Sequence, residues 1–126
     1  FAAGAEGIQM GTRFVSSQES QVHDNFKNSI TSAEINGTLL LNKKSKPIIR
    51  ALKTELTHKI DEAGVMDMTA LAGIKDLYFG GNMNAAPALS GQSSGLIKEI
   101  KPVQDIIELT IKEFNDTCSK MSNFSL

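Results

Sequence analysis

Apolar residues recur at helical spacing in three stretches of the chain. In the first stretch, Ser16 and Glu19 match a capping box, in which a hydroxyl and a carboxylate satisfy free backbone N–H groups at a helix start. The apolar positions that follow lie four, four and three residues apart and are Val22, Phe26, Ile30 and Ala33. We therefore predict a helix that begins near Ser16 and runs to about residue 33.

The second and third stretches each follow a proline, which suits the first turn of a helix because its missing N–H needs no partner there. After Pro47, the apolar stripe consists of Ile49, Leu52, Leu56, Ile60 and Ala63. Gly64 is placed to end this second helix. After Pro102, the stripe of the third helix consists of Val103, Ile106, Ile107, Ile111 and Phe114. This last helix is expected to reach Cys118, and residues 122–126 are expected to be frayed.

Extended structure is expected at two places. Residues 6–10 are rich in apolar side chains and bounded by glycine, which predicts a short buried strand with residues 11–13 as the turn that leaves it. Residues 38–41 follow an Asn-Gly turn signal and predict a second short strand. Between residues 65 and 97 the pattern is less regular. There we expect a short helix capped by Asp67, and loops at residues 78–82 and 90–95.

One strand cannot pair its own backbone donors and acceptors, so the partners of residues 6–10 must lie elsewhere. We therefore expect an α/β protein of which this chain is one part, mostly helical and with one or two strands. Residues 1–126 form a single segment in this interpretation. The alternative is a helical unit in which the strand has been misread.

Composition narrows the function classes. The chain has 126 residues, a formal net charge of -1 and a pI near 6.1, and it carries no basic stripe of the kind that binds nucleic acid. No apolar run approaches the roughly 18 residues of a membrane span. A single cysteine, Cys118, rules out an internal disulfide and fits a reducing, cytoplasmic compartment. The first residues do not have the pattern of a signal peptide.

Gly11 and Thr12 are the residues best suited to bind an anion. After a strand, they offer free backbone N–H groups and a hydroxyl at one point, a combination that often holds phosphate without a lysine. In (β/α) barrels, loops after the last strands frequently form such a phosphate site. The same pattern also occurs in turns that bind nothing, and spacing alone favours that simpler interpretation.

Two longer segments carry a family resemblance. Residues 3–14, AGAEGIQMGTRF, resemble the segment of nitronate monooxygenases that carries the last barrel strand, and the related flavin-containing enoyl-acyl-carrier-protein reductases share it. The similarity continues through residues 19–27. It returns at residues 88–97, ALSGQSSGLI, which resemble the Gly-Gln-x-x-Gly segment near the end of the family's chain. Residues 35–77 match only loosely.

The resemblance implies a TIM-like barrel that binds FMN at the carboxyl ends of its strands. It places the flavin phosphate against four consecutive residues, Gln9, Met10, Gly11 and Thr12, and residues 6–12 become the last barrel strand. Gly91 and Gln92 are expected at the edge of the flavin pocket. Two alternatives stay open: Gln9 as a buried core amide, and residues 91–92 as a loop packed on the barrel rim.

Other reactive side chains show no catalytic pattern. His23 and His58 lie singly on predicted helices, and Cys118 has no basic neighbour that would lower its pKa, so we assign none of them a role. No acidic residues are spaced as metal ligands. Because the family's catalytic histidine comes from an earlier part of the barrel, we expect the catalytic base to lie outside this chain.

These observations lead to one main hypothesis and two alternatives. The main hypothesis is an FMN-dependent oxidoreductase that oxidises alkyl nitronates or nitroalkanes with O2, in which this segment holds the FMN phosphate. The alternative within the fold is a nicotinamide-dependent enoyl-thioester reductase. A different class is a non-catalytic helical module. The expected partners are a small-molecule substrate and the remainder of the barrel, without nucleic acid or membrane, and a homodimer is left open.

Overall fold

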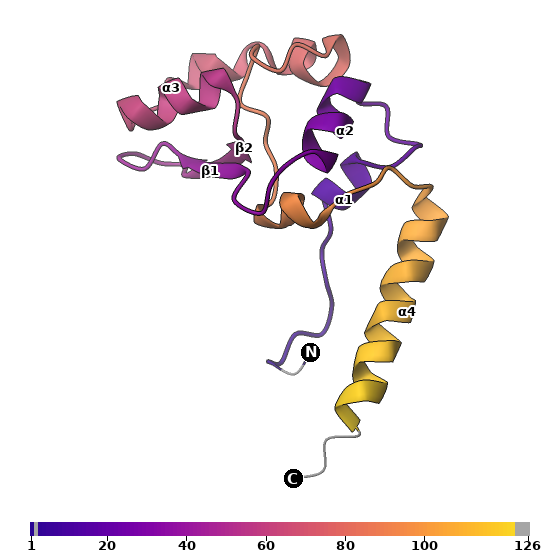
Figure 1. The fold of residues 1–126 in the computed structure, drawn as a ribbon. Coiled ribbons are helices and arrows are strands. Elements are labelled where there is room, and N and C mark those ends of the chain that lie inside the picture. The colour runs from indigo at the N-terminus through magenta and orange to yellow at the C-terminus, as the bar shows by residue number, and fades with distance from the viewer. Residues whose placement is uncertain (2, 123–126) are drawn as a thin grey trace.

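The computed structural model describes residue 1 and residues 3–122 (Figure 1). A compact upper body is built from helices and one hairpin, and the N-terminal segment (residues 3–11) and the last helix both extend away from it. The elements of the body are α1 (Thr12–Val15), α2 (Asp24–Thr31), β1 (Thr38–Leu41), β2 (Ile49–Leu52), α3 (Glu55–Ala63), η1 (Met68–Leu71), η2 (Asp76–Gly80) and η3 (Gln92–Leu96). The last helix is α4 (Val103–Ser122). The described part is thus mostly helical with two strands, as expected, and no barrel is formed within it.

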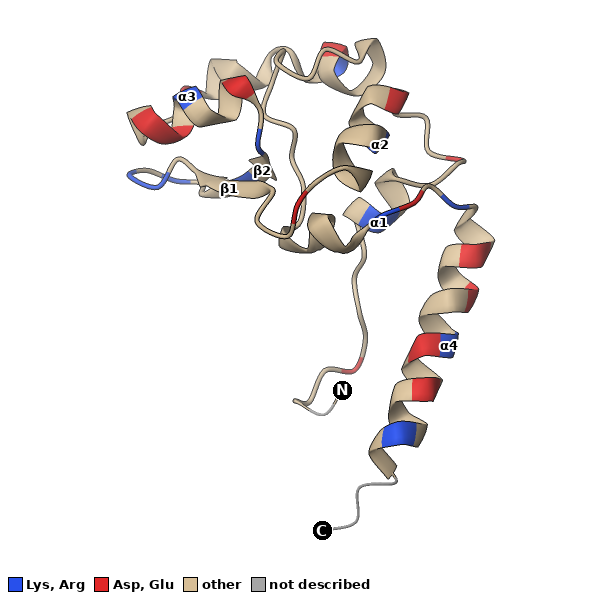
Figure 2. Cartoon of the chain, in the orientation of Figure 1, with Lys and Arg blue, Asp and Glu red and all other residues tan. Residues whose placement is uncertain are grey.

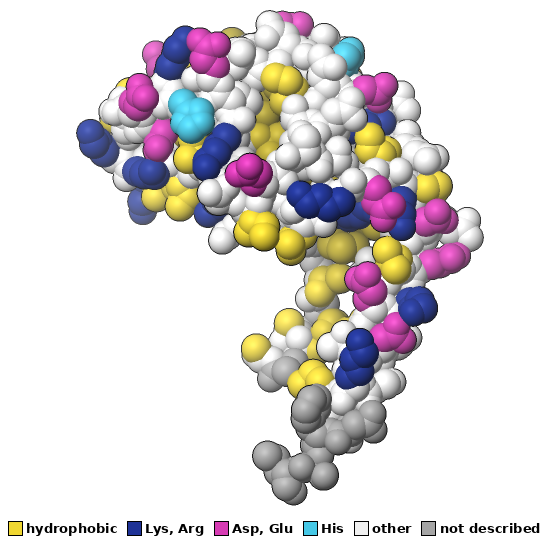
Figure 3. Space-filling view, viewed as in Figure 1, with side chains coloured by type: hydrophobic (Ala, Val, Ile, Leu, Met, Phe, Trp, Pro, Cys, Tyr) yellow, Lys and Arg dark blue, Asp and Glu magenta, His cyan; other side chains and the backbone are white. Residues whose placement is uncertain are grey.

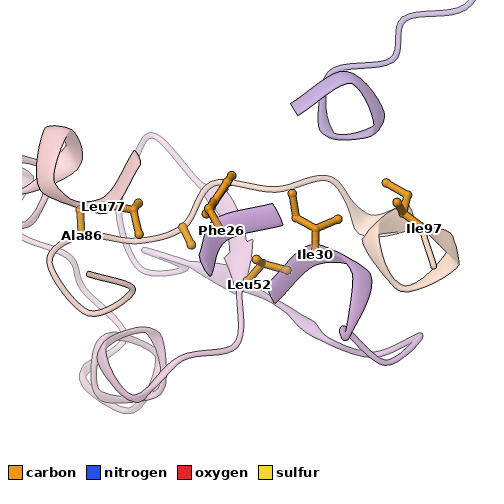
Figure 4. Close-up of a cluster of buried hydrophobic side chains, with 7 residues drawn as sticks. Phe26, Ile30, Leu52, Leu77, Ala86 and Ile97 are labelled. Atoms are coloured by element: carbon orange, nitrogen blue, oxygen red, sulfur yellow. The ribbon is translucent and has the colours of Figure 1, made fainter. Parts of the chain in front are cut away.

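Helix α2 supplies the main core of the body. Its predicted stripe is confirmed, because Phe26 and Ile30 are fully buried against Leu52, Leu77 and Ile97 (Figure 4). The predicted start at residue 16 is wrong. The helix begins at Asp24, eight residues later, and the side chain of the preceding histidine caps it instead of a capping box. The expected partners Ser16 and Glu19 are engaged elsewhere, as described below.

The hairpin β1–β2 and helix α3 enclose a second, smaller core. The predicted strand at residues 38–41 is confirmed, and it pairs antiparallel with β2 from Thr38 opposite Leu52 to Leu41 opposite Ile49. The predicted helix from Pro47 is wrong over its first half, because residues 49–52 pair with β1 and Pro47 lies in the hairpin loop. Its second half is confirmed as α3, which ends at Gly64 with φ +73°.

Residues 65–90 wrap the body with short turns. Asp67 caps η1 by accepting from the N–H of Thr69, as predicted. Residues 76–80 form one π turn, where a loop was expected at 78–82. Residues 88–90 then run antiparallel along β2, since Leu52 N–H donates to Ala88 O at 2.8 Å and Ser90 N–H donates to Arg50 O at 3.1 Å.

The N-terminal segment lies outside the compact body. Residues 6–10 pair with no strand in the described part of the chain and are largely exposed. Because the partners of this strand are expected outside the chain, the buried strand stays a prediction. The turn expected at 11–13 is the start of α1. The ring of Phe1 packs on Phe114 of α4 with centroids 5.0 Å apart.

Helix α4 begins directly after Pro102, as predicted, and reaches beyond Cys118 to residue 122, whereas residues 123–126 of the expected frayed tail lie outside the described residues. Its apolar stripe is mostly exposed: only Ile106 is buried, while Ile107, Ile111 and Phe114 face solvent. Cys118 is exposed as well and does not pack in a core. Figure 3 shows hydrophobic side chains gathered where the N-terminal segment and α4 leave the body. None of the described helices has the length and apolarity to span a membrane.

Candidate functional site

A single hydrogen bond joins the two segments that carry the family resemblance. The N–H of Gly91 donates to the hydroxyl oxygen of Thr12 at 2.8 Å, across 79 positions of sequence. Thr12 opens α1, and Gly91 stands directly before η3, so the bond fixes the starts of both short helices against each other. The sequence predicted both residues for one pocket, and the structure brings them into contact.

An open cleft of about 490 Å³ lies beside this bond, between the N-terminal segment, residues 91–99 and α4. Its lining includes five of the six predicted residues, namely Gln9, Met10, Gly11, Thr12 and Gly91. Gln92 does not line it. Gln92 instead lines a neighbouring groove. Gln9 is exposed in the described chain, and the alternative of a core amide inside the complete barrel stays open.

Gly11 has open space where a side chain would begin. A Cβ built on Gly11 would meet no atom within 4 Å, and its φ of −84° is one that any residue adopts. Neither packing nor backbone strain within the described chain therefore requires glycine there. At Gly91, by contrast, a Cβ would lie 3.3 Å from the Thr12 hydroxyl and would press on the bond between the two segments.

Two residues that line the cleft carry unused backbone donors. The first N–H groups of a helix have no partner inside it, and no described hydrogen bond uses the N–H of Thr12 or Arg13. The Thr12 hydroxyl keeps its own proton to donate while it accepts from Gly91. This set of donors around an uncrowded glycine fits an anionic oxygen group.

Charged residues of both signs also line the cleft, and Arg13 is one that sequence reasoning missed. Figure 2 shows a basic position on α1 and both acidic and basic positions along α4. Its guanidinium donates to Glu99 O at 2.9 Å and to the Ser16 hydroxyl at 3.3 Å, so it crosslinks α1 to the segment that leads into α4. Lys98, Glu99 and Glu113 complete the charged lining. The position of Arg13 directly after Thr12 was the signal available in the sequence.

The segment between α1 and α2 anchors the start of α4. Both carboxylate oxygens of Glu19 accept from the N–H of Val103 at 3.0 Å, and the N–H of Gln18 donates to Lys101 O at 3.0 Å. Glu19 therefore caps a helix, but α4 rather than the one predicted from the capping-box pattern. The buried hydroxyl of Ser16 bonds to Arg13 O. The turn at residues 11–13 and α4 are thus held as one unit.

The other side chains with reactive groups make hydrogen bonds or packing contacts within the fold. His23 Nδ1 accepts from the N–H of Asn25 at the start of α2, and its ring lies against Gly81, whose φ of +76° and lack of a side chain allow this approach. Burial raises the pKa of Tyr78, whose ring packs edge-on against Phe26. Among the described residues, no group of three or more histidine, cysteine or acidic side chains is placed to hold a metal ion.

Comparison with known protein sequences shows which family this chain resembles. The family model described as nitronate monooxygenase matches residues 1–113. A probable nitronate monooxygenase of Staphylococcus saprophyticus is 27% identical over 124 residues, which is 93% of this chain and 35% of that protein. A 5-hydroxy-7a-methyl-1-oxo-octahydro-1H-indene-4-carboxyl-CoA dehydrogenase of Rhodococcus jostii is 35% identical over 65 residues, which is 52% of this chain and 18% of that protein.

Solved structures agree in fold. FabK from Thermotoga maritima superposes with a TM-score of 0.90 at 37% identity and covers 98% of this chain and 42% of its own. A methionine-to-alanine variant of FabK from the same organism gives a TM-score of 0.83 at 37% identity, with 98% and 38% covered. The chain therefore spans about two fifths of these structures and about a third of the Staphylococcus relative.

Proposed function

The chain belongs to the nitronate monooxygenase family, and from this premise we propose that it is the flavin-phosphate-binding part of an FMN-dependent oxidoreductase. The observation that carries the proposal is the uncrowded Gly11 beside the bonded pair Thr12 and Gly91. A glycine that its own chain does not require, next to free donors, is explained by the close approach of another group.

Each residue has a defined part in holding the phosphate. Gly11 leaves space for the phosphate. The N–H groups of Thr12 and Arg13 would donate to the phosphate oxygens, and the Thr12 hydroxyl would add a third donor. Gly91 orients that hydroxyl through its own N–H. Gln9 and Met10 line the same cleft and would contact the bound cofactor.

The flavin supplies the redox chemistry, because its ring accepts and passes on electrons when bound. The chain's own residues bind and orient the cofactor, and the base that removes a substrate proton belongs to another part of the whole protein. That remaining part also covers the exposed apolar face of α4, where Ile107, Ile111 and Phe114 otherwise meet water.

Substitution at Gly11 in the full-length protein tests the phosphate site. Gly11→Val is expected to abolish flavin retention, and Gly11→Ala to weaken it less, because the smaller side chain intrudes less on the phosphate. Circular dichroism should stay unchanged, since a Cβ at this position meets nothing within the chain. Flavin absorbance of the purified variants, normalised to protein, is the measurement. Unchanged flavin content in Gly11→Val would contradict the site, and a colourless wild type would favour a non-catalytic helical module.

For the substrate of the whole protein we propose an alkyl nitronate, oxidised with O2. The support is the description of the matching family and the Staphylococcus relative of the same name. Nitronate-dependent O2 uptake by the full-length enzyme is the expected activity. The rate of O2 uptake is expected to fall to background when the nitronate is replaced by an enoyl thioester with NADH.

A second candidate is reduction of an enoyl thioester by a nicotinamide cofactor through the flavin. It is favoured by the 37% identity to FabK, which we take to represent the flavin-containing enoyl reductases, against 27% to the Staphylococcus relative. The name of the Rhodococcus relative also contains a CoA thioester. NADH oxidation that depends on a crotonyl thioester, without nitronate-dependent O2 uptake, would replace the first candidate by this one.

A further inference from the structure

One cation in the wall of the proposed phosphate cleft has no carboxylate partner. Arg13 lines this cleft together with Gly11 and Thr12, and it follows Thr12 directly on α1. None of the ion pairs formed by the described residues includes Arg13. The backbone of Glu99 accepts from Arg13, but the carboxylate of Glu99 pairs with Lys101 at 2.7 Å instead. The positive charge of Arg13 is therefore not neutralised within the described chain.

The guanidinium of Arg13 is nevertheless held in place. Its Nη1 donates to Glu99 O at 2.9 Å and to the Ser16 hydroxyl at 3.3 Å, and that buried hydroxyl donates in turn to Arg13 O. Both acceptors are neutral oxygens, so they fix the guanidinium without cancelling its charge. No hydrogen bond among the described residues uses Nη2 or Nε, and these atoms keep their donors for another group.

Burial separates Arg13 from the other charges of the cleft. Two cations and two carboxylates line it, so their formal charges cancel and the exposure of each decides its weight. Lys98, Glu99 and Glu113 are exposed, where water and salt screen a charge most strongly, whereas Arg13 is half-buried. The ammonium of Lys98 is also bonded to Ala33 O at 2.7 Å. Arg13 therefore contributes most to the electrostatic potential beside the start of α1.

We propose that Arg13 supplies the positive charge by which this site selects a phosphorylated flavin over riboflavin. The inference rests on the proposed function and names the residue that gives the phosphate site its specificity. A phosphate monoester carries roughly 1.5 to 2 negative charges at neutral pH. Riboflavin ends in an uncharged hydroxyl at the same place and is otherwise identical. Backbone N–H groups donate to either oxygen, so a fixed cation is the element that separates the two ligands by charge.

The test compares the dissociation constants of FMN and riboflavin for the full-length protein after its flavin has been removed. Quenching of flavin fluorescence during titration is the measurement. Arg13→Gln removes the charge but keeps a hydrogen-bond donor, and Arg13→Lys keeps the charge but loses the fork. Arg50→Gln is the matched control. The half-buried Arg50 likewise donates to a hydroxyl, that of Thr38 at 2.9 Å, and has no ion pair, but it does not line the cleft.

The ratio of the riboflavin to the FMN dissociation constant is expected to fall about tenfold in Arg13→Gln, which corresponds to the loss of one charge-assisted contact. The dissociation constant of riboflavin itself should stay close to wild type. Arg13→Lys should keep most of the ratio, and Arg50→Gln all of it. An unchanged ratio in Arg13→Gln overturns the proposal. Equal weakening of both flavins overturns it as well, because Arg13 would then only crosslink α1 to the segment before α4.

Failure of the proposed function gives a different result. A wild-type protein that binds riboflavin as tightly as FMN would overturn the phosphate site itself. A wild-type protein that prefers FMN, together with an Arg13→Gln variant that keeps this preference, overturns only the role of Arg13.

Discussion

Replacing Thr12 by valine removes one hydroxyl while keeping the branched shape of the side chain. The N–H of Gly91 then loses its partner at 2.8 Å in a partly buried position. Removing a neutral hydrogen bond and leaving its donor unsatisfied costs about 1–2 kcal/mol. Because the bond joins α1 to the start of η3, we expect that loss in the free energy of unfolding. We also expect a flavin dissociation constant raised about tenfold, since 1.4 kcal/mol corresponds to a factor of ten.

Urea denaturation and flavin titration of the full-length protein measure the two effects. Thr12→Ser keeps the hydroxyl and should therefore retain most of the stability and most of the flavin affinity of wild type. Thr31→Val is the matched control, because the exposed Thr31 hydroxyl bonds only to Asn28 O at 3.2 Å within its own helix. Thr31→Val should change the free energy of unfolding by no more than about 0.5 kcal/mol. If Thr12→Val bound flavin as tightly as wild type, or if Thr12→Ser failed as badly as valine, the hydroxyl would have no part in the site.

Three further predictions concern how the chain holds its elements. Glu19→Ala should lower stability by about 1 kcal/mol, because Val103 loses its cap, and helix content measured by circular dichroism should fall with it. Gly64→Ala should cost about 1 kcal/mol in urea denaturation, since alanine is strained at φ +73°. The backbone N–H of Thr69, and then its side chain, lower the pKa of Asp67, so the cap is present at neutral pH and is lost as pH falls through that lowered pKa. An NMR titration in which Asp67 titrates at or above its usual value would contradict this.

The helical stripes were readable from sequence because they depend on local spacing. Phe26 and Ile30 are buried as their period predicts, and Gly64 ends α3 where predicted. The errors arise where a distant partner outweighs a local pattern. Glu19 matches a capping box, but its carboxylate bonds to Val103, 84 positions away. Residues 49–52 fit a helical stripe, yet pairing with β1 and with residues 88–90 makes them a central strand.

The candidate site was predicted in part. Sequence resemblance placed Thr12 and Gly91 in one pocket, and the structure bonds them directly. Gln92 lines the neighbouring groove, and its place at the edge of a flavin pocket stays a prediction. Arg13 was missed because its crosslink to Glu99 O depends on backbone 86 positions away. The strand at residues 6–10 stays a prediction, because a strand needs neighbours and the described chain offers none.

The bond between Thr12 and Gly91 also constrains the order of events during synthesis. A ribosome releases Gly11 and Thr12 well before Gly91, and α4, which closes the cleft, follows later still. Under the proposed function, a nascent chain therefore carries half of a phosphate site that has no affinity until its C-terminal half has emerged and docked. Flavin capture then has to wait until residues 91–122 have been synthesised and have docked against the N-terminal segment.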